Sequence, residues 1–362
     1  MTDDIRSVIV ATGSCIPTRC VPNGDFIDHR LFEGHGRPFD PADNPKIISK
    51  FREITGIHER HHASDDLVAS DLAIEAGANA LDGSGVDPET LDYLVVAHNF
   101  GDVPASNRRS DFVPSLAARV KRGLGIANPG CIAYDLAFGC PGWLQAVIQV
   151  DYYLRSGDAR RALVIGTETL SRVSDPHDRD SMIYADGAGA AVLEARPCRG
   201  ERVGILAHAA RSDSLDHARL MWMGRSFNPD FGDNQLFLKM HGRDLYEYAL
   251  TTVPGVVRQS LEKAGLALGD VHKVLIHQAN AKMDEAILKR LFKSCGVQDI
   301  PEGVMPMSIA RLGNSSVATI PTLLDLIRRG KLEGQKLSSG DIVVFASVGA
   351  GMNVNSVVYR CP

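Results

Sequence analysis

Cys140 stands in a local sequence that suits a nucleophilic thiol. Gly139 precedes it, Pro141 follows it, and the run 143–150 beyond is mostly apolar. Proline suits the first position of a helix, and the residue before a proline is disfavoured in the helical conformation. We therefore predict a helix that begins at Pro141, lies buried in the protein centre, and carries Cys140 at its N-terminus.

The predicted position of Cys140 would favour covalent chemistry. A helix N-terminus presents a partial positive charge and free N–H groups, which lower the pKa of a nearby thiol and favour the thiolate. A thiolate is the form that attacks carbonyl carbons and forms covalent intermediates. Cysteine is also a common small hydrophobic core residue, and the local sequence alone leaves this alternative open.

The chain repeats itself. Segments 80–86 and 94–99 align without gaps with segments 260–266 and 274–279. Each pair predicts the end of a helix, a glycine, a short loop and a continuous apolar strand. Such strands are typical of a sheet covered on both faces. We predict an α/β protein of two duplicated halves, residues 1–197 and 198–362, because 362 residues exceed one small core.

Equivalent positions of the two halves hold different residues. Ala97 ends a strand in the first half, and His277 takes its place in the second. The position of Cys140 corresponds, within one residue, to that of Asn314. Equivalent positions of a pseudo-symmetric pair face each other across the interface, so Cys140, His277 and Asn314 are predicted to converge on one pocket.

Composition excludes several classes of function. A formal net charge of −5 is not typical of a nucleic-acid-binding protein, which usually carries a positive charge. The acidic N-terminus lacks a signal-peptide pattern, and no apolar run is long enough to span a bilayer. Seven cysteines without a C-x-x-C pair predict neither a disulfide framework nor a zinc site, and suit the cytoplasm. The histidines around Glu59 and Arg60 fit a charged strand edge better than a metal site, so no metal is expected.

Six short motifs, in order along nearly the whole chain, resemble the thiolase superfamily and within it the β-ketoacyl-acyl-carrier-protein synthase III branch. They are 138–142 (FGCPG), 171–176 (SRVSDP), 185–190 (ADGAGA), 277–280 (HQAN), 312–316 (LGNSS) and 347–351 (SVGAG). The resemblance implies a thiolase-like fold of five layers, αβαβα, and a homodimer.

The resemblance also implies roles for the predicted pocket. Cys140 would take an acyl group from a thioester, and the N–H groups of Cys140 and Ala350 would form the oxyanion hole. His277 and Asn314 would hold the thioester carbonyl of a malonyl-type extender during decarboxylation. Ser347 stands where degradative thiolases have a second cysteine, which favours decarboxylative condensation over thiolysis.

Substrates and partners follow from the same resemblance. Acyl groups would arrive on coenzyme A or on an acyl carrier protein, with no resident cofactor, and the enzyme would serve fatty acid biosynthesis. Basic residues Arg172 and Lys282 would meet the phosphopantetheine or carrier end. Asn280, grouped with these substrate-binding residues, would orient water or His277. An acyltransferase, or a dialkylresorcinol-type enzyme that joins two acyl chains, remains the alternative on the same three residues.

The chain departs from the family pattern in places that bear on substrate choice. Lys50 and Ile54 occupy the positions where priming synthases clamp adenine with tryptophan and arginine. Val113 replaces a phenylalanine that closes the acyl pocket of the neighbouring subunit, which would admit a longer or branched chain. An insertion around 211–238 would form a lid over the acyl tunnel, or else a surface loop with an apolar anchor.

Overall fold

A computed structural model describes residues 4–198, 200–232 and 234–362. Two sheets form its frame. The first has strand order β1-β7-β6-β4-β5 and the second has order β11-β12-β13-β8. The first sheet contains β1 (Asp4–Cys15), β4 (Tyr93–Ala97), β5 (Ile132–Leu136), β6 (Arg161–Thr169) and β7 (Asp186–Cys198). The second contains β8 (Gly204–Ser212), β11 (Val271–Ile276), β12 (Ile342–Gly349) and β13 (Asn353–Arg360).

The two sheets repeat one topology. In the first, β1 and β7 are antiparallel, β7 and β6 are antiparallel, and β6 and β4 are parallel. In the second, β8, β13, β12 and β11 follow each other in the same senses. The aligned segments of the sequence fall on β4 and β11, each preceded by a helix, as predicted. The exact boundary between the halves stays a prediction.

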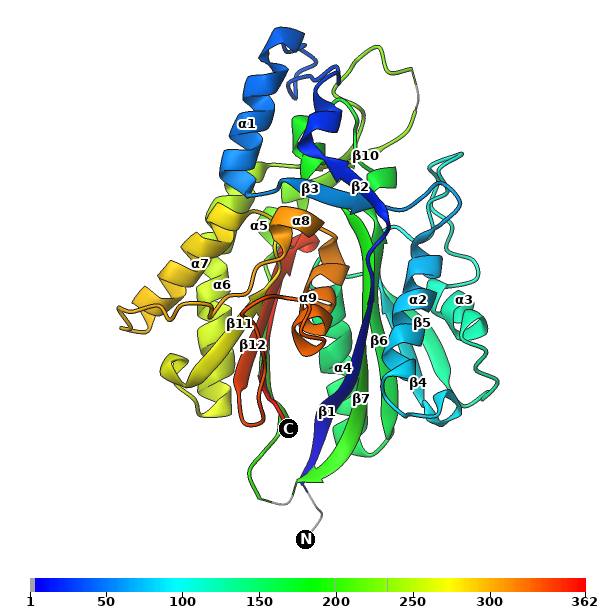
Figure 1. Ribbon diagram of the computed structural model, residues 1–362, viewed down its shortest axis with the longest axis vertical. Coiled ribbons are helices and arrows are strands. Elements are labelled where there is room, and N and C mark those ends of the chain that lie inside the picture. The colour runs from blue at the N-terminus through cyan, green and yellow to red at the C-terminus, as the bar shows by residue number, and fades with distance from the viewer. Residues whose placement is uncertain (1–3, 199, 233) are drawn as a thin grey trace.

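Helices cover both faces of each sheet, which gives the predicted five layers (Figure 1). Helices α2 (Ala69–Asp82) and α3 (Leu116–Gly123) pack on the outer face of the first sheet. Helices α6 (Gly242–Ala264) and α7 (Ala281–Ser294) pack on the outer face of the second. Between the sheets lie α4 (Gly142–Ser156) and α9 (Thr319–Arg328).

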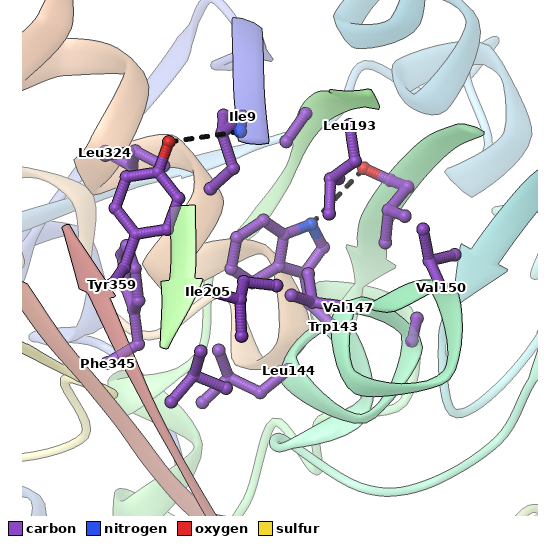
Figure 2. Packing of buried hydrophobic residues seen from close by; sticks show 14 of the residues in the cluster. Ile9, Trp143, Leu144, Val147, Val150, Leu193, Ile205, Leu324, Phe345 and Tyr359 are labelled. Carbon is purple, nitrogen blue, oxygen red and sulfur yellow. Dashed lines mark hydrogen bonds between the residues drawn. The ribbon is translucent and has the colours of Figure 1, made fainter. Parts of the chain in front are cut away.

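The central layer is the main hydrophobic core. Trp143 and Val147 of α4 pack with Leu324 of α9 and with side chains from both sheets (Figure 2). The indole N–H of Trp143 donates to the Val164 carbonyl at 3.3 Å. The Tyr359 hydroxyl accepts from the Ile9 amide at 3.1 Å and so joins the two sheets. The predicted burial of the helix after Cys140 is confirmed.

Smaller elements lie at one end of the layers. Strands β2 (Arg19–Pro22) and β3 (Glu59–His62) pair with each other, as do β9 (Met221–Gly224) and β10 (Phe237–Met240). The short helices are α1 (Asn44–Thr55), α5 (Ser214–His217) and α8 (Ile309–Leu312). Within the described residues, no helix combines the length and the hydropathy that crossing a bilayer requires.

Candidate active site

The turn before α4 presents Cys140 at the end of the central layer. The helix begins at Gly142, with Pro141 as its N-cap, one residue later than predicted. Gly139 adopts a positive φ of 68°, and its carbonyl accepts from the Gly142 amide at 2.9 Å. This turn leaves Cys140 just outside the first turn of a buried helix.

A glycine loop from the second half packs directly against this turn. A Cβ on Gly349, the last residue of β12, would lie 2.5 Å from the Cys140 nitrogen. A Cβ on Gly139 would lie 2.9 Å from the Ala350 nitrogen. Only glycine allows backbones to approach so closely. The backbones of Cys140 and Ala350 therefore adjoin, and Ala350 lines the same cavity as Cys140.

The carboxamide of Asn314 is held in one orientation. Its Oδ1 accepts from the Ser316 amide at 2.8 Å. A backbone N–H can only donate, so the oxygen end of the amide faces the chain and the NH2 end remains for a ligand. The Asn314 backbone is fixed as well, because its carbonyl accepts from the Ala185 amide at 2.8 Å.

His277 follows β11 directly, and its amide donates to the Ala346 carbonyl of neighbouring β12 at 2.8 Å. The side chain is buried, and burial lowers its pKa to about 4, so the imidazole is neutral at neutral pH. Among the described residues, its Nδ1 has no hydrogen-bond partner. His277 is not part of the cavity wall around Cys140, whereas Asn314 is.

Cys140 opens into a cavity of about 250 Å³. Its wall contains Asn314, Ser316 and Ala350, and is otherwise mostly apolar. The remaining wall residues are Asn99, Phe100, Gly139, Leu170, Tyr184, Met221, Trp222, Met223 and Leu238. Four of these come from the β9–β10 hairpin. Of the two alternatives for the insertion, the structure favours the lid, since the hairpin covers the cavity of Cys140.

The predicted lowering of the Cys140 pKa is wrong. Burial raises the pKa of the thiol to about 11. A hydrogen bond from the Ser316 hydroxyl to the sulfur, 3.3 Å long, works in the opposite direction. The local sequence shows the helix N-terminus but does not show how completely the tertiary structure removes water from the sulfur.

A second cavity, of about 670 Å³, lies between α1, α6 and α7. Its wall is mostly apolar, with four basic residues and the acidic residues Asp43 and Asp180. Lys50, Ile54 and Asn280 line it.

Tyr184 lines the smaller cavity and Met240 lines the larger one. The Tyr184 hydroxyl lies 3.8 Å from the Met240 sulfur, so the two cavities adjoin at this contact.

The predicted substrate-binding residues are placed very differently from each other. Asn280 lines the larger cavity, while its Oδ1 accepts from the Met283 amide and caps α7. Lys282 is exposed and pairs with Glu53 at 3.0 Å. Val113 is 85% exposed on this single chain.

Arg172 is buried, and its guanidinium contacts other residues of the chain. It is only 8% exposed, and its guanidinium donates to the Ser64 carbonyl at 2.8 Å and to Asp65 at 3.3 Å. It lines neither cavity. These contacts anchor the segment after β3. A role of Arg172 in binding a carrier stays a prediction.

Several polar residues of the site were not found from the sequence. In the larger cavity these are Lys46, Arg179 and Arg243, which join Lys50, already noted at the position of the adenine clamp. Beside Cys140 lie Ser316, Asn99 and Glu168, which are discussed below. Of the three residues beside Cys140, only Ser316 carried a signal, since it follows Asn314 in a motif. Asn99 and Glu168 come together through the pairing of β4 with β6.

One group of side chains has the composition of a metal site. Donor atoms of Cys20, Glu59 and His61 lie within 4.8 Å of one another on the β2–β3 pair. They line neither cavity. The sequence did not reveal this group, because strand pairing brings Cys20 next to His61. The expectation of no metal stays a prediction.

Comparison with known proteins gives one consistent result. The family model of 3-oxoacyl-[acyl-carrier-protein] synthase III matches residues 134–214, and the model of its C-terminal part matches residues 261–361. A β-ketoacyl-[acyl-carrier-protein] synthase III of Erythrobacter litoralis is 32% identical, covering 98% of this chain and 99% of the relative. One of Cereibacter sphaeroides is 33% identical with the same coverage.

The fold agrees with the sequence matches. The crystal structure of a 3-oxoacyl-(acyl carrier protein) synthase III from Pseudomonas aeruginosa superposes with a TM-score of 0.80 at 28% identity. The match covers 99% of this chain and 98% of that one. The thiolase-like arrangement of layers is thereby confirmed.

Proposed function

The chain belongs to the 3-oxoacyl-[acyl-carrier-protein] synthase III family, and we propose that its reaction takes place on Cys140, His277 and Asn314. It is a condensing acyltransferase of the β-ketoacyl synthase III type. The observation that carries the assignment of Cys140 and Asn314 is the cavity that both line together with Ala350. His277 lines neither cavity, and its assignment rests on the motif 277–280 and on its buried, neutral imidazole.

In the first half-reaction the Cys140 sulfur attacks the carbonyl carbon of an acyl thioester. The tetrahedral oxyanion is stabilised by the backbone N–H groups of Cys140 and Ala350, which are already in place before reaction. The C–S bond to the carrier breaks, and the proton lost by Cys140 ends on the departing thiol. The product is an acyl-enzyme, whose acyl chain occupies the apolar cavity under the β9–β10 hairpin.

In the second half-reaction a malonyl-type thioester loses carbon dioxide. The neutral His277 and the NH2 group of Asn314 donate to its thioester carbonyl and stabilise the enolate. The enolate carbon attacks the acyl-cysteine, and Cys140 leaves as a thiolate. Neutral donors suit this role, because they stabilise a developing negative charge without first forming an ion pair with the malonyl carboxylate.

The larger cavity is proposed to take the arm that carries the thioester. It adjoins the Cys140 cavity at Tyr184 and Met240, and its wall is mostly apolar, with four basic residues against two acidic ones. Such a wall suits a phosphopantetheine arm, whether on coenzyme A or on an acyl carrier protein. No resident cofactor is needed for either half-reaction.

Assembly and location belong to the same proposal. Val113 is exposed on one chain, which fits a residue that reaches the acyl cavity of a second copy in a homodimer. All seven cysteines lie in the described residues and are free thiols. Free thiols are typical of reducing compartments, which supports a cytoplasmic location.

The proposal is tested by separating the two half-reactions. Asn314→Ala should still form an acyl-enzyme, seen as a mass increase of the intact protein, but release carbon dioxide from a malonyl thioester at least about a hundredfold more slowly. Cys140→Ser, the control, should lose the acyl-enzyme. Equal loss of both steps in Asn314→Ala would contradict the role of Asn314, and retained acylation in Cys140→Ser would remove Cys140 as the nucleophile.

A further inference from the structure

The buried sulfur of Cys140 has a specific hydrogen-bond donor. The Ser316 hydroxyl, itself buried, donates to Sγ at 3.3 Å. Burial makes the thiolate unfavourable, and the carboxylate of nearby Glu168 makes it less favourable still. A donor aimed at the sulfur is therefore the contact that offsets both effects in the free enzyme.

A short chain of hydrogen bonds fixes the direction of that donor. Asn99 Nδ2 donates to the Ser316 oxygen at 3.1 Å and to Glu168 Oε1 at 2.5 Å. A serine hydroxyl has one proton. Because Asn99 approaches the oxygen as a donor, that proton is directed to the sulfur. Glu168 in turn holds Asn99 with its NH2 group, and not its oxygen, toward Ser316.

The sheet explains why these residues meet. Strands β4 and β6 are parallel neighbours, with Ala97 opposite Gly166. Asn99 lies two residues beyond Ala97, and Glu168 lies two residues beyond Gly166, so their side chains come together at the same edge of the sheet. Glu168 is 1% exposed there, and among the described residues no basic side chain forms an ion pair with it.

The backbone of Ser316 is strained. Its φ is +52°, which a residue with a β-carbon rarely adopts. The hydrogen bond from its amide to Asn314 Oδ1 holds this conformation. Strain of this kind is retained where the surrounding structure imposes it, commonly at functional positions. The same bond couples the orientation of Asn314 to that of Ser316.

We propose that Ser316 is a catalytic hydrogen-bond donor to the Cys140 sulfur, and that Asn99 and Glu168 are positioning residues that hold its hydroxyl in the donating direction. This inference rests on the proposed function, in which Cys140 is the nucleophile. Ser316 keeps its proton throughout. It stabilises the thiolate that attacks the acyl thioester and the thiolate that leaves in the condensation step.

The test measures the thiol without any substrate. The full-length chain is alkylated with iodoacetamide between pH 6.5 and 9.5, and the modification of Cys140 is followed by peptide mass spectrometry. Cys20 is an exposed free thiol, and its alkylation rate in the same sample measures the activity of the reagent. Ser316→Ala should slow alkylation of Cys140 about tenfold at each pH, because a hydrogen bond to a charged group is lost. The rate at Cys20 should stay unchanged.

Additional variants separate a catalytic from a structural role. Ser316→Gly also removes the hydroxyl, but glycine accepts the positive φ, so it should fold and show the same loss. Asn99→Ala should slow alkylation in the wild-type background and add nothing in the Ser316→Ala background, since it acts through Ser316. Ser315→Ala, the same change one residue earlier, is the control and should react as wild type does.

Charged neighbours are controlled in the same experiment. The titratable groups that act on Cys140 are Glu168 and Tyr184, and His277 belongs to the same proposed site. The pKa of Tyr184 is raised well above its ordinary value by burial and that of His277 lies near 4, so both stay neutral over the range used. Burial raises the pKa of Glu168 to about 8, so the profile is repeated in Glu168→Gln, which keeps an acceptor for Asn99 without the charge.

The outcomes are distinct. Glu168→Gln should react at least as fast as wild type, whereas Glu168→Ala should react more slowly. Unchanged alkylation rates at Cys140 in both Ser316→Ala and Ser316→Gly would overturn the inference. That result would leave the acyl-enzyme assay unaffected, and a failure to acylate wild-type Cys140 would instead overturn the proposed function.

Discussion

At the scale of single residues, burial decides the chemistry of the site more than the local sequence does. His277 is 3% exposed, and burial lowers the pKa of its imidazole. Among the described residues, no carboxylate forms an ion pair with it that would stabilise a positive charge. The neutral form is therefore favoured in the folded protein. This neutrality supports its proposed function as a donor, and it also makes the folded state sensitive to acid.

The pH dependence of stability follows from the direction of this shift. An unfolded histidine binds a proton as the pH falls through its ordinary value of 6.5, whereas folded His277 does so only near 4. The unfolded state therefore gains protons first, and stability falls with pH in this window. Between pH 7 and pH 5, His277 should account for a loss of about 2 kcal/mol in the free energy of unfolding.

The measurement is urea unfolding of wild type and His277→Asn at both pH values. The variant should lose less stability than wild type on acidification, because asparagine does not titrate. Other buried groups, including His62, contribute equally to both proteins and cancel in the difference. Equal losses in the two proteins would contradict the assigned pKa of His277.

The residues that could be predicted from the sequence are those carried by short motifs. Cys140, Asn314 and Ala350 were found in this way, and the structure brings them to one cavity. Asn99 and Glu168 could not be found, because their contact depends on the register of two parallel strands. The predicted direction of the pKa shift of Cys140 was wrong for a related reason, because burial is a property of the whole fold and not of the turn at Cys140.

At the scale of elements, the β9–β10 hairpin is held over the cavity by a buried ion cluster. Lys239 of β10 is 1% exposed, and its ammonium contacts Asp175 and Asp178 and lies 3.4 Å from the centre of the Phe227 ring. Asp175 also accepts from the Phe227 amide at 2.8 Å. These contacts tie the lid, and the segment that leads into it, to the first half of the chain.

Removing the cation should therefore release the lid. Lys239→Met leaves two buried carboxyl groups unpaired and should cost about 3–5 kcal/mol of unfolding free energy. Limited proteolysis should then cut within 225–236 sooner than in wild type. Adding Asp175→Asn should recover part of the loss, because it removes one of the unpaired charges.

A matched surface change provides the comparison. Lys289 is exposed and pairs with Glu285 one turn away, so Lys289→Met should cost less than about 1 kcal/mol. If Lys239→Met proved as mild as Lys289→Met in urea unfolding, the cluster would not be what holds the hairpin.

Elements with a strong periodic pattern could be predicted, and those defined by packing could not. The helix and strand pairs around 80–97 and 260–276 were correct, because their apolar runs and glycine stops are local signals. The helix after Cys140 begins at Gly142, one residue later than predicted, because Pro141 is its N-cap. The position of the insertion over the cavity depends on the Lys239 cluster, whose members are far apart in sequence.

At the scale of the whole molecule, duplication builds the site at the junction of two similar sheets. Each half contributes what the other lacks: the first supplies Cys140, and the second supplies Asn314 and the Ala350 loop. The larger cavity lies beside this site, between α1, α6 and α7. With a net charge of −5, the molecule as a whole repels an acidic carrier, so binding requires a local basic surface.

Helix α6 offers a direct test of that basic surface. Arg243, in its first turn, lines the larger cavity and pairs with Glu247 at 3.1 Å. Arg258, about four turns along, makes an equivalent pair with Glu262 at 3.5 Å. Both arginines are exposed and each lies one turn from its glutamate, so the two charge reversals disturb the helix to a similar extent.

Only one of the two should disturb the carrier. Arg243→Glu should raise the KM for a thioester borne on an acyl carrier protein roughly thirtyfold. Two unit charges about 4 Å apart in water interact by about 1 kcal/mol, and the reversal turns an attraction of that size into an equal repulsion. The effect should fade at high salt, where such interactions are screened. Arg258→Glu should leave this KM unchanged, and kcat should stay the same in both. An equal rise of KM in the two variants, or none in either, would mean that the carrier does not dock at the larger cavity beside Arg243. A charge change alters the binding of a partner only where that partner docks.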